Sequence, residues 1–531
     1  MFTKEVLTVT FLLVFFAVMI FIGLRCRRHA TDVNGFVLGG RSVGPWLTAF
    51  AFGTSYFSAV IFVGYAGQFG WNFGLASTWI GLGNAFIGSL LPWVILGRRT
   101  RLMTQQINSK TMPDFFGKRF NSPTLKILSS VIVFIFLIPY TASLYNGLSS
   151  LFNIAFDIPY VAVIIAMSVF TGIYVIFGGY MATAINDFIQ GIIMLVGIVC
   201  VVAAVLNANG GFSEAVIGLS KIPAENSSMN GAFTSFFGPQ PVFLVVVVLL
   251  TSLGTWGLPQ MVGKFYSITN EEAVKKGTII STVFALIVAG GCYFLGGFAR
   301  LYNTESLYSD GKLLFDRIIP SMLANMPALI VAIVIVLVLS ASMSTLSSLV
   351  LTSSSTITLD VVMAKKDASE KKKVLVMRLF IVFFIVISAI LAYLKDTYNF
   401  SMIAQMMGVS WGALAGSFLA PFLYGLYWKR TTPAAVAVSF VQGVAFTTVM
   451  FLKSIGVIAL PETGVIGFVF KTSLHCGVFT MLLGLVLVPI VSLFTRKLDE
   501  KYVDGMFECY SRTVSVNARY AIGEETKESE E

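Results

Sequence analysis

Long apolar runs recur along the whole chain, and Gly, Pro or clusters of basic residues separate them. A helix needs about 20 apolar residues to cross a hydrocarbon core of about 30 Å, so each run predicts a membrane-spanning helix. We expect thirteen spans, at 5–24, 46–66, 75–97, 126–151, 158–178, 181–206, 241–263, 278–299, 327–358, 375–394, 399–428, 434–455 and 474–494. The sequence therefore predicts an all-α integral membrane protein.

The composition agrees with this interpretation. Of 531 residues, 56% are hydrophobic and 12% are charged, and the mean hydropathy is +0.85, outside the range of soluble globular domains. The first run is followed at once by Arg25, Arg27 and Arg28, and it is long for the apolar part of a signal peptide. We therefore expect it to remain as a helix.

The distribution of basic residues predicts the orientation, because cytoplasmic loops are enriched in Lys and Arg. With the N-terminus outside and the C-terminus in the cytoplasm, all but eight of the 36 Lys and Arg residues fall on the cytoplasmic face. Lys264 is one of the residues assigned to that face. The net charge of +10 is then a topology signal, and no nucleic-acid partner is expected. We expect a multi-pass protein of the plasma membrane, the inner membrane of a bacterium.

Helix-breaking and polar residues interrupt two of the spans. They are Gly53, Thr54, Ser55 and Ser58 in the second span and Gly254, Gly257 and Pro259 in the seventh. Each of these spans opens a unit of five, and since five is odd, the two units enter the membrane from opposite sides. Paired broken helices in inverted repeats form the transport site of many carriers. Gly and Pro also serve close packing in membrane helices, but two interruptions at matching places favour a binding site.

The expected organisation follows from these spans. It comprises an extra N-terminal helix and cytoplasmic loop at 1–45, a first five-helix repeat at 46–206, an extracellular loop at 207–240, a second repeat at 241–430, two C-terminal helices at 431–495 and a cytoplasmic tail at 496–531.

The ninth span is rich in hydroxyl groups. Ser344, Thr345 and Ser348 fall on one helix face, and the carbonyl of Ala341 lies one turn before them. Neutral oxygens suit a monovalent cation such as sodium, because they lack the carboxylate density that divalent cations attract. A packing face whose hydroxyls bond back to their own helix explains the same pattern. The segment alone leaves both interpretations open.

Other function classes have weaker support. The five cysteines form no CxxC pair, and no phosphate-binding GxxxxGK[ST] motif is present. A membrane enzyme would cluster His, Cys or carboxylates within its spans, which this chain almost lacks, so no enzyme is expected. A channel would have hydroxyl-lined spans too, but it does not need two broken helices.

Several stretches together resemble the sodium:solute symporter family. They are GRSVGPWLTAFAFGTSYFSAV, TMPDFFGKRF, GGYMATAINDFIQ, SASMSTLSS and SWGALAGSFLAPFLYGLYWKRTTPAAV, spread over residues 35 to 455. The resemblance implies a leucine-transporter-type core of ten helices, with one helix before it and two after it. It also implies a symporter that carries sodium and a small organic solute across the bilayer by alternating access. Proton coupling in the same fold remains an alternative.

The resemblance also implies two sets of sodium ligands. The first site takes the carbonyls of Thr54, Phe57 and Ala341 and the hydroxyls of Ser344 and Thr345. In the sialic-acid carriers of the family, an aspartate that matches Asp187 joins span-nine hydroxyls that match Ser344, Ser347 and Ser348 in a second site.

Asp187 has two further interpretations. It stands near the start of an apolar run, and no Lys or Arg lies between Lys126 and Lys221. A carboxylate at a helix start is favoured by the helix dipole, whereas Asp at mid-membrane costs about 2.5 to 3.5 kcal/mol. A role on the exit path of sodium is the other interpretation.

The solute is expected to be an amino acid such as proline or a small carboxylate, with a sugar or a vitamin as the alternative. The expected lining of its pocket is Tyr56, Ser58, Tyr140, Thr251, Thr255 and Trp256. Proline carriers of the family have an aspartate at the position of Tyr56, and residues 127–177 contain no Lys or Arg that would hold a carboxylate as in the sialic-acid carriers.

Overall fold

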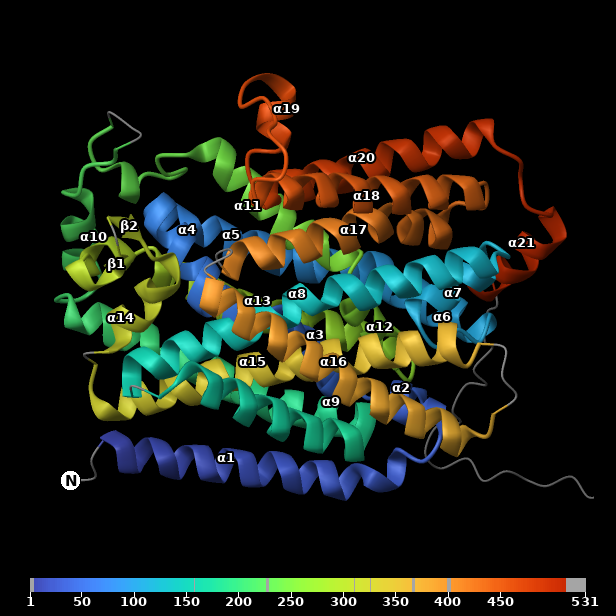
Figure 1. Cartoon of the computed structure of the whole chain (residues 1–531), viewed down its shortest axis with the longest axis horizontal. Coiled ribbons are helices and arrows are strands. Elements are labelled where there is room, and N and C mark those ends of the chain that lie inside the picture. Colours follow the sequence, from blue (N-terminus) through green and yellow to red (C-terminus); the bar gives the residue numbers. More distant parts are fainter. Residues whose placement is uncertain are drawn as a thin grey trace, which may run out of the picture.

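The computed structural model describes residues 4–156, 158–225, 229–309, 311–324, 326–364, 368–398 and 403–511. The protein is mostly helical, and its long helices run along one common axis (Figure 1). One end of this bundle carries α10, β1 and β2, and the opposite end carries α6, α7 and α21 (Figure 1). We call these the α10 end and the α7 end.

Up to the end of the second broken span, the helices are α1 (Lys4–Cys26), α2 (Val33–Leu38), α3 (Pro45–Tyr56), α4 (Ala66–Phe73), α5 (Thr78–Ala85), α6 (Arg98–Gln106), α7 (Met112–Arg119), α8 (Pro123–Phe156), α9 (Tyr160–Ala208), α10 (Phe212–Ser220), α11 (Pro241–Leu253) and α12 (Pro259–Tyr266). They are followed by α13 (Glu271–Gly296), strands β1 (Tyr308–Ser309) and β2 (Lys312–Leu313), α14 (Ile318–Ala324), α15 (Ala328–Ile357), α16 (Glu370–Tyr398), α17 (Ile403–Tyr427), α18 (Pro433–Ser454), α19 (Gly464–Val469), α20 (Ser473–Phe494) and α21 (Glu500–Phe507).

Among the described residues, ten helical segments are long and apolar enough to cross a membrane, or eleven if a bent pair is one span. Two of them are very long, Val60–Gln106 with 47 residues and Tyr160–Ala208 with 49. The second holds two predicted spans, and its backbone turns at Gly179, where φ is +56°. The prediction of a membrane protein of many helices is confirmed, and the number thirteen stays a prediction.

Both predicted interruptions are present. Helix α3 ends at Tyr56, and a π-helical stretch, Val60–Tyr65, leads on into α4. Helix α11 ends at Leu253, and after a 3-10 turn α12 continues at an angle of 40°. The inverted relation of the two five-helix units remains a prediction.

Helix α15 runs through the interior of the bundle. It contacts α9, α8, α3, α16, α1 and α12. Helix α1 lies along one edge, and α17, α18 and α20 form the opposite edge (Figure 1). The Ser and Thr residues of α15 therefore face other helices.

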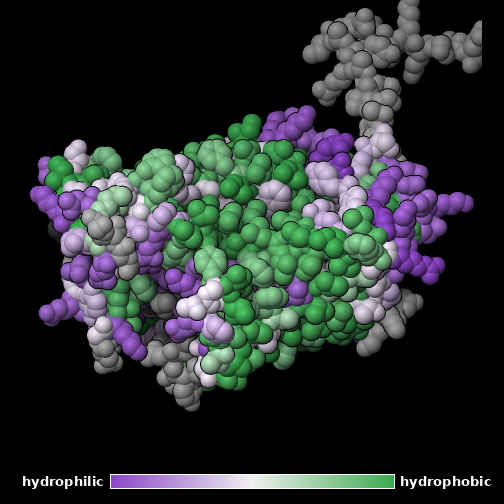
Figure 2. Space-filling view, turned by 90° about the horizontal axis from the view of Figure 1, so that it is seen from above, coloured by the Kyte–Doolittle hydropathy of each residue, from purple (hydrophilic) through white to green (hydrophobic). Residues whose placement is uncertain are grey.

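On the face that Figure 2 shows, an apolar band lies between two more polar ends. Large apolar side chains stand exposed on the outer helices, for example Phe21 on α1, Ile279 on α13 and Leu379 on α16. Such a band is the surface that lipid chains cover. Residues 512–531, most of the expected tail, lie outside the described residues.

Two glycines allow α4 and α13 to cross in backbone contact. A Cβ added at Gly70 would lie 1.9 Å from the carbonyl oxygen of Gly296, and one at Gly296 would lie 2.1 Å from that of Ala66. Small residues at crossings of this kind let membrane helices approach closely.

We therefore expect Gly296→Ala to lower the thermal stability of the purified protein, because the two backbones must separate. The expected cost is about 1–3 kcal/mol, as for other overpacked sites. Gly290→Ala on the same helix is the control, since a Cβ there meets nothing within 4 Å. Equal melting temperatures of the two variants in detergent would contradict the crossing.

Candidate functional site

The broken helix α3 meets α15 at a cluster of four oxygen atoms. The hydroxyl of Ser344 donates to the carbonyl of Thr54 at 3.1 Å and to that of Ala341 at 3.2 Å. The hydroxyl of Thr345 lies 3.1 Å from each of the same two carbonyls. All four residues are buried. The structure thus brings together four of the five predicted ligands of the first sodium site.

The fifth predicted ligand, Phe57, lies at the break itself, directly after the end of α3. It lines a small cavity together with Ser58 and Ala341. The four hydrogen-bonded oxygens come from two elements far apart in the sequence, which is the kind of set that binds a hard monovalent cation. We call Thr54, Phe57, Ala341, Ser344 and Thr345 the oxygen cluster.

Asp187 lies on α9 and is fully buried, but its neighbour in space is a lysine. The ammonium of Lys264, on α12, is 3.6 Å from its carboxylate. Lys264 is only 3% exposed, so it lies inside the bundle and not in the surface loop where the sequence placed it. The count of basic residues assigned it to a loop, because it follows directly after the predicted end of the seventh span at residue 263.

Lys264 also reaches α15 and, through it, α3. Its ammonium donates to the hydroxyl of Ser348 at 2.9 Å, and that oxygen is 2.7 Å from the hydroxyl of Ser55. The ring of Tyr180 lies below the ammonium, with 5.4 Å between nitrogen and centroid. Two of the predicted residues of the second sodium site, Asp187 and Ser348, thus both contact this ammonium. The hydroxyl of Ser347 instead donates to the carbonyl of Ser344 on its own helix.

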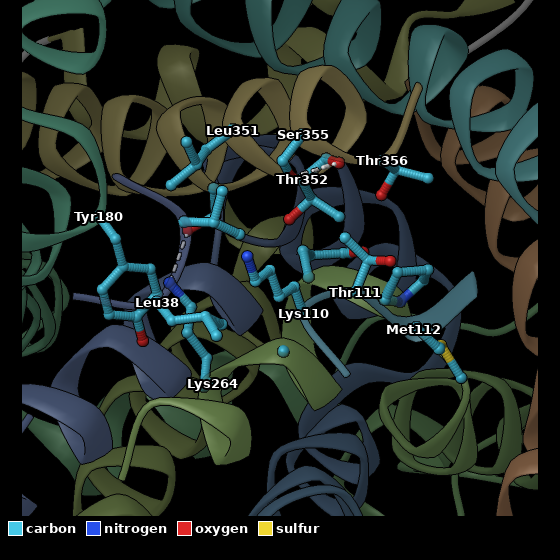
Figure 3. Close-up of a pocket in the computed structure, with 15 residues that line it drawn as sticks. Leu38, Lys110, Thr111, Met112, Tyr180, Lys264, Leu351, Thr352, Ser355 and Thr356 are labelled. Atoms are coloured by element: carbon cyan, nitrogen blue, oxygen red, sulfur yellow. Dashed lines mark hydrogen bonds between the residues drawn. The ribbon is translucent and has the colours of Figure 1, made fainter. Parts of the chain in front are cut away.

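Lys264 is one of the residues that line a small cavity. The cavity has a volume of about 50 Å³, which is room for a few water molecules. Figure 3 shows Lys264 and Tyr180 at one side of it and Thr111 and Met112, from the α7 end, at the other.

Three of the six predicted residues of the solute pocket join the broken helices to their neighbours. The hydroxyl of Tyr56 donates to the carbonyl of Thr251, so it joins α3 to α11. The hydroxyl of Thr255 donates to the carbonyl of Gly88, and the indole N–H of Trp256 donates to that of Ile87, each at 2.9 Å.

The remaining predicted residue of α11 is satisfied within its own helix. The hydroxyl of Thr251 donates to the carbonyl of Val247 at 2.9 Å. Thr251, Thr255 and Trp256 therefore already use their polar side-chain groups on backbone carbonyls.

Three other polar groups are buried beside the break. The hydroxyls of Ser58 and Tyr140 and the indole N–H of Trp411 are close to one another. In the part of the chain that the structure describes, none of the three forms a hydrogen bond of good geometry. The rings of Tyr140 and Trp411 meet edge to face at 6.1 Å, and Trp411 packs on Gly254 of the second broken span.

Sequence reasoning missed Lys264 and Trp411. Trp411 stands in the motif SWGALAG of the eleventh span, but an aromatic residue in an apolar run gives no signal that separates packing from binding. Lys264 had one available signal, since it continues the seventh span within two turns of Pro259.

Comparison with known proteins gives one consistent result. Residues 36–443 match the model of the sodium:solute symporter family. The chain is similar to the osmoregulated proline transporter OpuE of Bacillus subtilis, with 29% identity over 84% of this chain and 89% of that protein. It is also similar to sodium/proline symporter 2 of Staphylococcus saprophyticus, with 28% identity over 82% and 84%.

A solved structure shares the fold. The substrate-bound, outward-open structure of a sodium-coupled sialic acid symporter matches with a TM-score of 0.74 at 16% identity. The match covers 93% of this chain and 99% of that one.

Proposed function

Since the chain belongs to the sodium:solute symporter family, we propose that it imports a small amino acid, with proline as the first candidate, together with sodium. It is a transporter and not an enzyme, and its function is sodium-coupled symport of a solute. The observation that carries the proposal is the oxygen cluster, in which Ser344 and Thr345 of α15 meet the Thr54 carbonyl of the broken helix.

The oxygen cluster suits coupling because its ligands belong to two separate elements. A sodium ion held by Thr54 of α3 and by Ser344 and Thr345 of α15 stabilises the arrangement in which these elements are together. Binding energy shifts a conformational equilibrium only through such differential contacts. Sodium thus favours the state that accepts the solute, and its loss favours release on the other side.

Proline is the first candidate because the similar bacterial carriers are proline transporters. Ser58, Tyr140 and Trp411 offer two hydroxyls and one N–H beside the break, and buried polar groups of this kind are normally paired. A solute carboxylate is met by such donors and by the ends of the broken helices. A small carboxylate is the second candidate, and a sugar or a vitamin follows.

The proposed arrangement in the membrane is the one that the sequence predicts. It has thirteen spans, inverted repeats at 46–206 and 241–430, the N-terminus outside and the C-terminus in the cytoplasm of a bacterium. The α7 end is then cytoplasmic, and residues of that end, Thr111 and Met112, line the cavity at Lys264.

We expect vesicles that contain the protein to take up labelled proline when a sodium gradient is imposed. A panel of proline, other neutral amino acids, monocarboxylates, pantothenate and sugars, each with sodium or choline outside, measures both the solute and the coupling ion. Uptake that is equal in choline and is driven by a pH gradient would identify a proton-coupled carrier.

We expect Ser344→Ala and Thr345→Ala each to raise the sodium concentration for half-maximal uptake about tenfold or more, because each removes one ligand oxygen of the cation. Ser342→Ala is the matched control, since this buried hydroxyl donates only to the Val338 carbonyl of its own helix in the described structure. If the sodium concentration for half-maximal uptake rose equally in all three variants, the effect would come from a general disturbance of α15 and not from the loss of a sodium ligand.

We expect Trp411→Phe to raise the KM for the solute about tenfold at saturating sodium, since the ring stays on Gly254 while one donor N–H is lost. Trp256→Phe loses an N–H that already binds the carbonyl of Ile87, so it should lower the melting temperature and leave KM near the wild-type value. The reverse result would place the pocket at Trp256.

A further inference from the structure

We propose that the ammonium of Lys264 is a tethered cation that fills the second cation position, so that the protein carries one sodium ion per solute. The proposal rests on the proposed function and specifies its stoichiometry. It concerns Asp187 and Ser348, which the sequence assigned to a second sodium site, and Lys264, which it did not consider there.

The geometry around Lys264 is that of a bound cation. The ammonium has a carboxylate oxygen of Asp187 at 3.6 Å, the hydroxyl of Ser348 at 2.9 Å and the face of Tyr180 at 5.4 Å. An anion, a neutral oxygen and an aromatic face are the groups that attract a positive charge. Asp187 has no hydrogen-bonded partner in the described part of the chain, so Lys264 is its nearest compensating charge.

Electrostatics allows one cation at this place. Asp187 and Lys264 are both almost fully buried, and together they are neutral. A sodium ion added at Asp187 would stand about 4 Å from the ammonium. At an effective dielectric constant of about 20, the repulsion of two unit charges at that distance weakens binding roughly a thousandfold. The tethered ammonium therefore excludes the second sodium ion.

The tethered cation is joined to the oxygen cluster by a short path. Ser348 accepts from Lys264 and lies 2.7 Å from the hydroxyl of Ser55. Ser55 is the neighbour of Thr54 in α3, and Ser348 follows Thr345 by one helical turn in α15. The ammonium thus holds α12 against the same two elements that the transported sodium joins.

The cavity beside Lys264 distinguishes a bound ion from a tethered one. Its lining includes Lys264 and Ser348 as well as Lys110 and Thr111, which come from the α7 end. A sodium ion bound beside Asp187 would be free to leave the protein, whereas the ammonium is covalently attached to its side chain and cannot leave. One unit of charge is therefore transported with each zwitterionic solute, and the second stays in the protein throughout the cycle.

The number of sodium ions is the direct test. Purified wild-type protein should bind one radioactive sodium ion per chain without any solute. In vesicles clamped at fixed voltage, one sodium ion should enter with each labelled solute. Two bound ions, or a flux ratio of two in the wild type, would overturn the proposal.

Removal of the tethered charge should open the position. We expect Lys264→Met to bind two sodium ions per chain, because the Asp187 carboxylate then lacks its cation, and the slope of uptake against sodium should steepen from about one toward two. Lys275→Met is the control, since Lys275 is an exposed lysine of α13 with the same charge, and it should keep one ion. A single bound ion in Lys264→Met would contradict the assignment.

The double variant Asp187→Asn/Lys264→Met guards against misfolding, since it removes both buried charges together. If Lys264→Met does not reach the membrane, we expect the double variant to reach it and to bind one sodium ion per chain. A double variant that is absent from the membrane, or that binds two ions, would also overturn the proposal. The ions are counted on purified protein without solute. A solute panel that shows no sodium-dependent uptake would therefore contradict the proposed function, and the number of sodium ions bound per chain could still be measured.

Discussion

The fold depends on how the backbone is satisfied where α3 stops inside the bundle. In a membrane interior, an unpaired carbonyl costs several kcal/mol, so a broken helix persists only where other groups meet its open ends. Here the hydroxyls of Ser344 and Thr345 reach the carbonyl of Thr54, and they come from α15, the helix that other elements enclose on most sides. The need to pair that carbonyl places α3 against α15, and the same oxygens are the ones suited to sodium.

The fold class and the hydroxyl face of α15 were predictable from local signals, whereas the Thr54 and Phe57 carbonyls were assigned by the resemblance to the family. Apolar runs of sufficient length gave the helices, and Gly, Pro and Ser within two of them gave the breaks at Tyr56 and Leu253. The spacing of Ser344 and Thr345 placed both hydroxyls on one face, although it did not distinguish packing from binding. Helix ends were less predictable. Helix α13, for example, begins seven residues before its predicted apolar span, where Asn270 caps it.

Partners from distant segments were not predictable. The rule that basic residues mark cytoplasmic loops reads only the neighbourhood in sequence, so it placed Lys264 outside the membrane and left Asp187 without a partner. Likewise, a hydroxyl in a span can bond to a neighbouring backbone, as that of Thr255 does, or stay free, as that of Ser58 does in the described structure. Which occurs depends on the helix that packs opposite, and a single sequence does not contain that information.

A tethered cation changes what the carrier can achieve. With a tenfold sodium gradient and 100 mV across the membrane, one sodium ion supplies about 3.7 kcal/mol, enough to concentrate a neutral solute roughly 500-fold. A second transported ion would square that ratio, but it would also double the sodium spent on each solute. By holding Asp187 with Lys264, the protein keeps a second positive charge where α9, α12 and α15 meet. In the proposed scheme this charge has the structural role of a bound ion, but it does not contribute to the driving force because it does not cross the membrane.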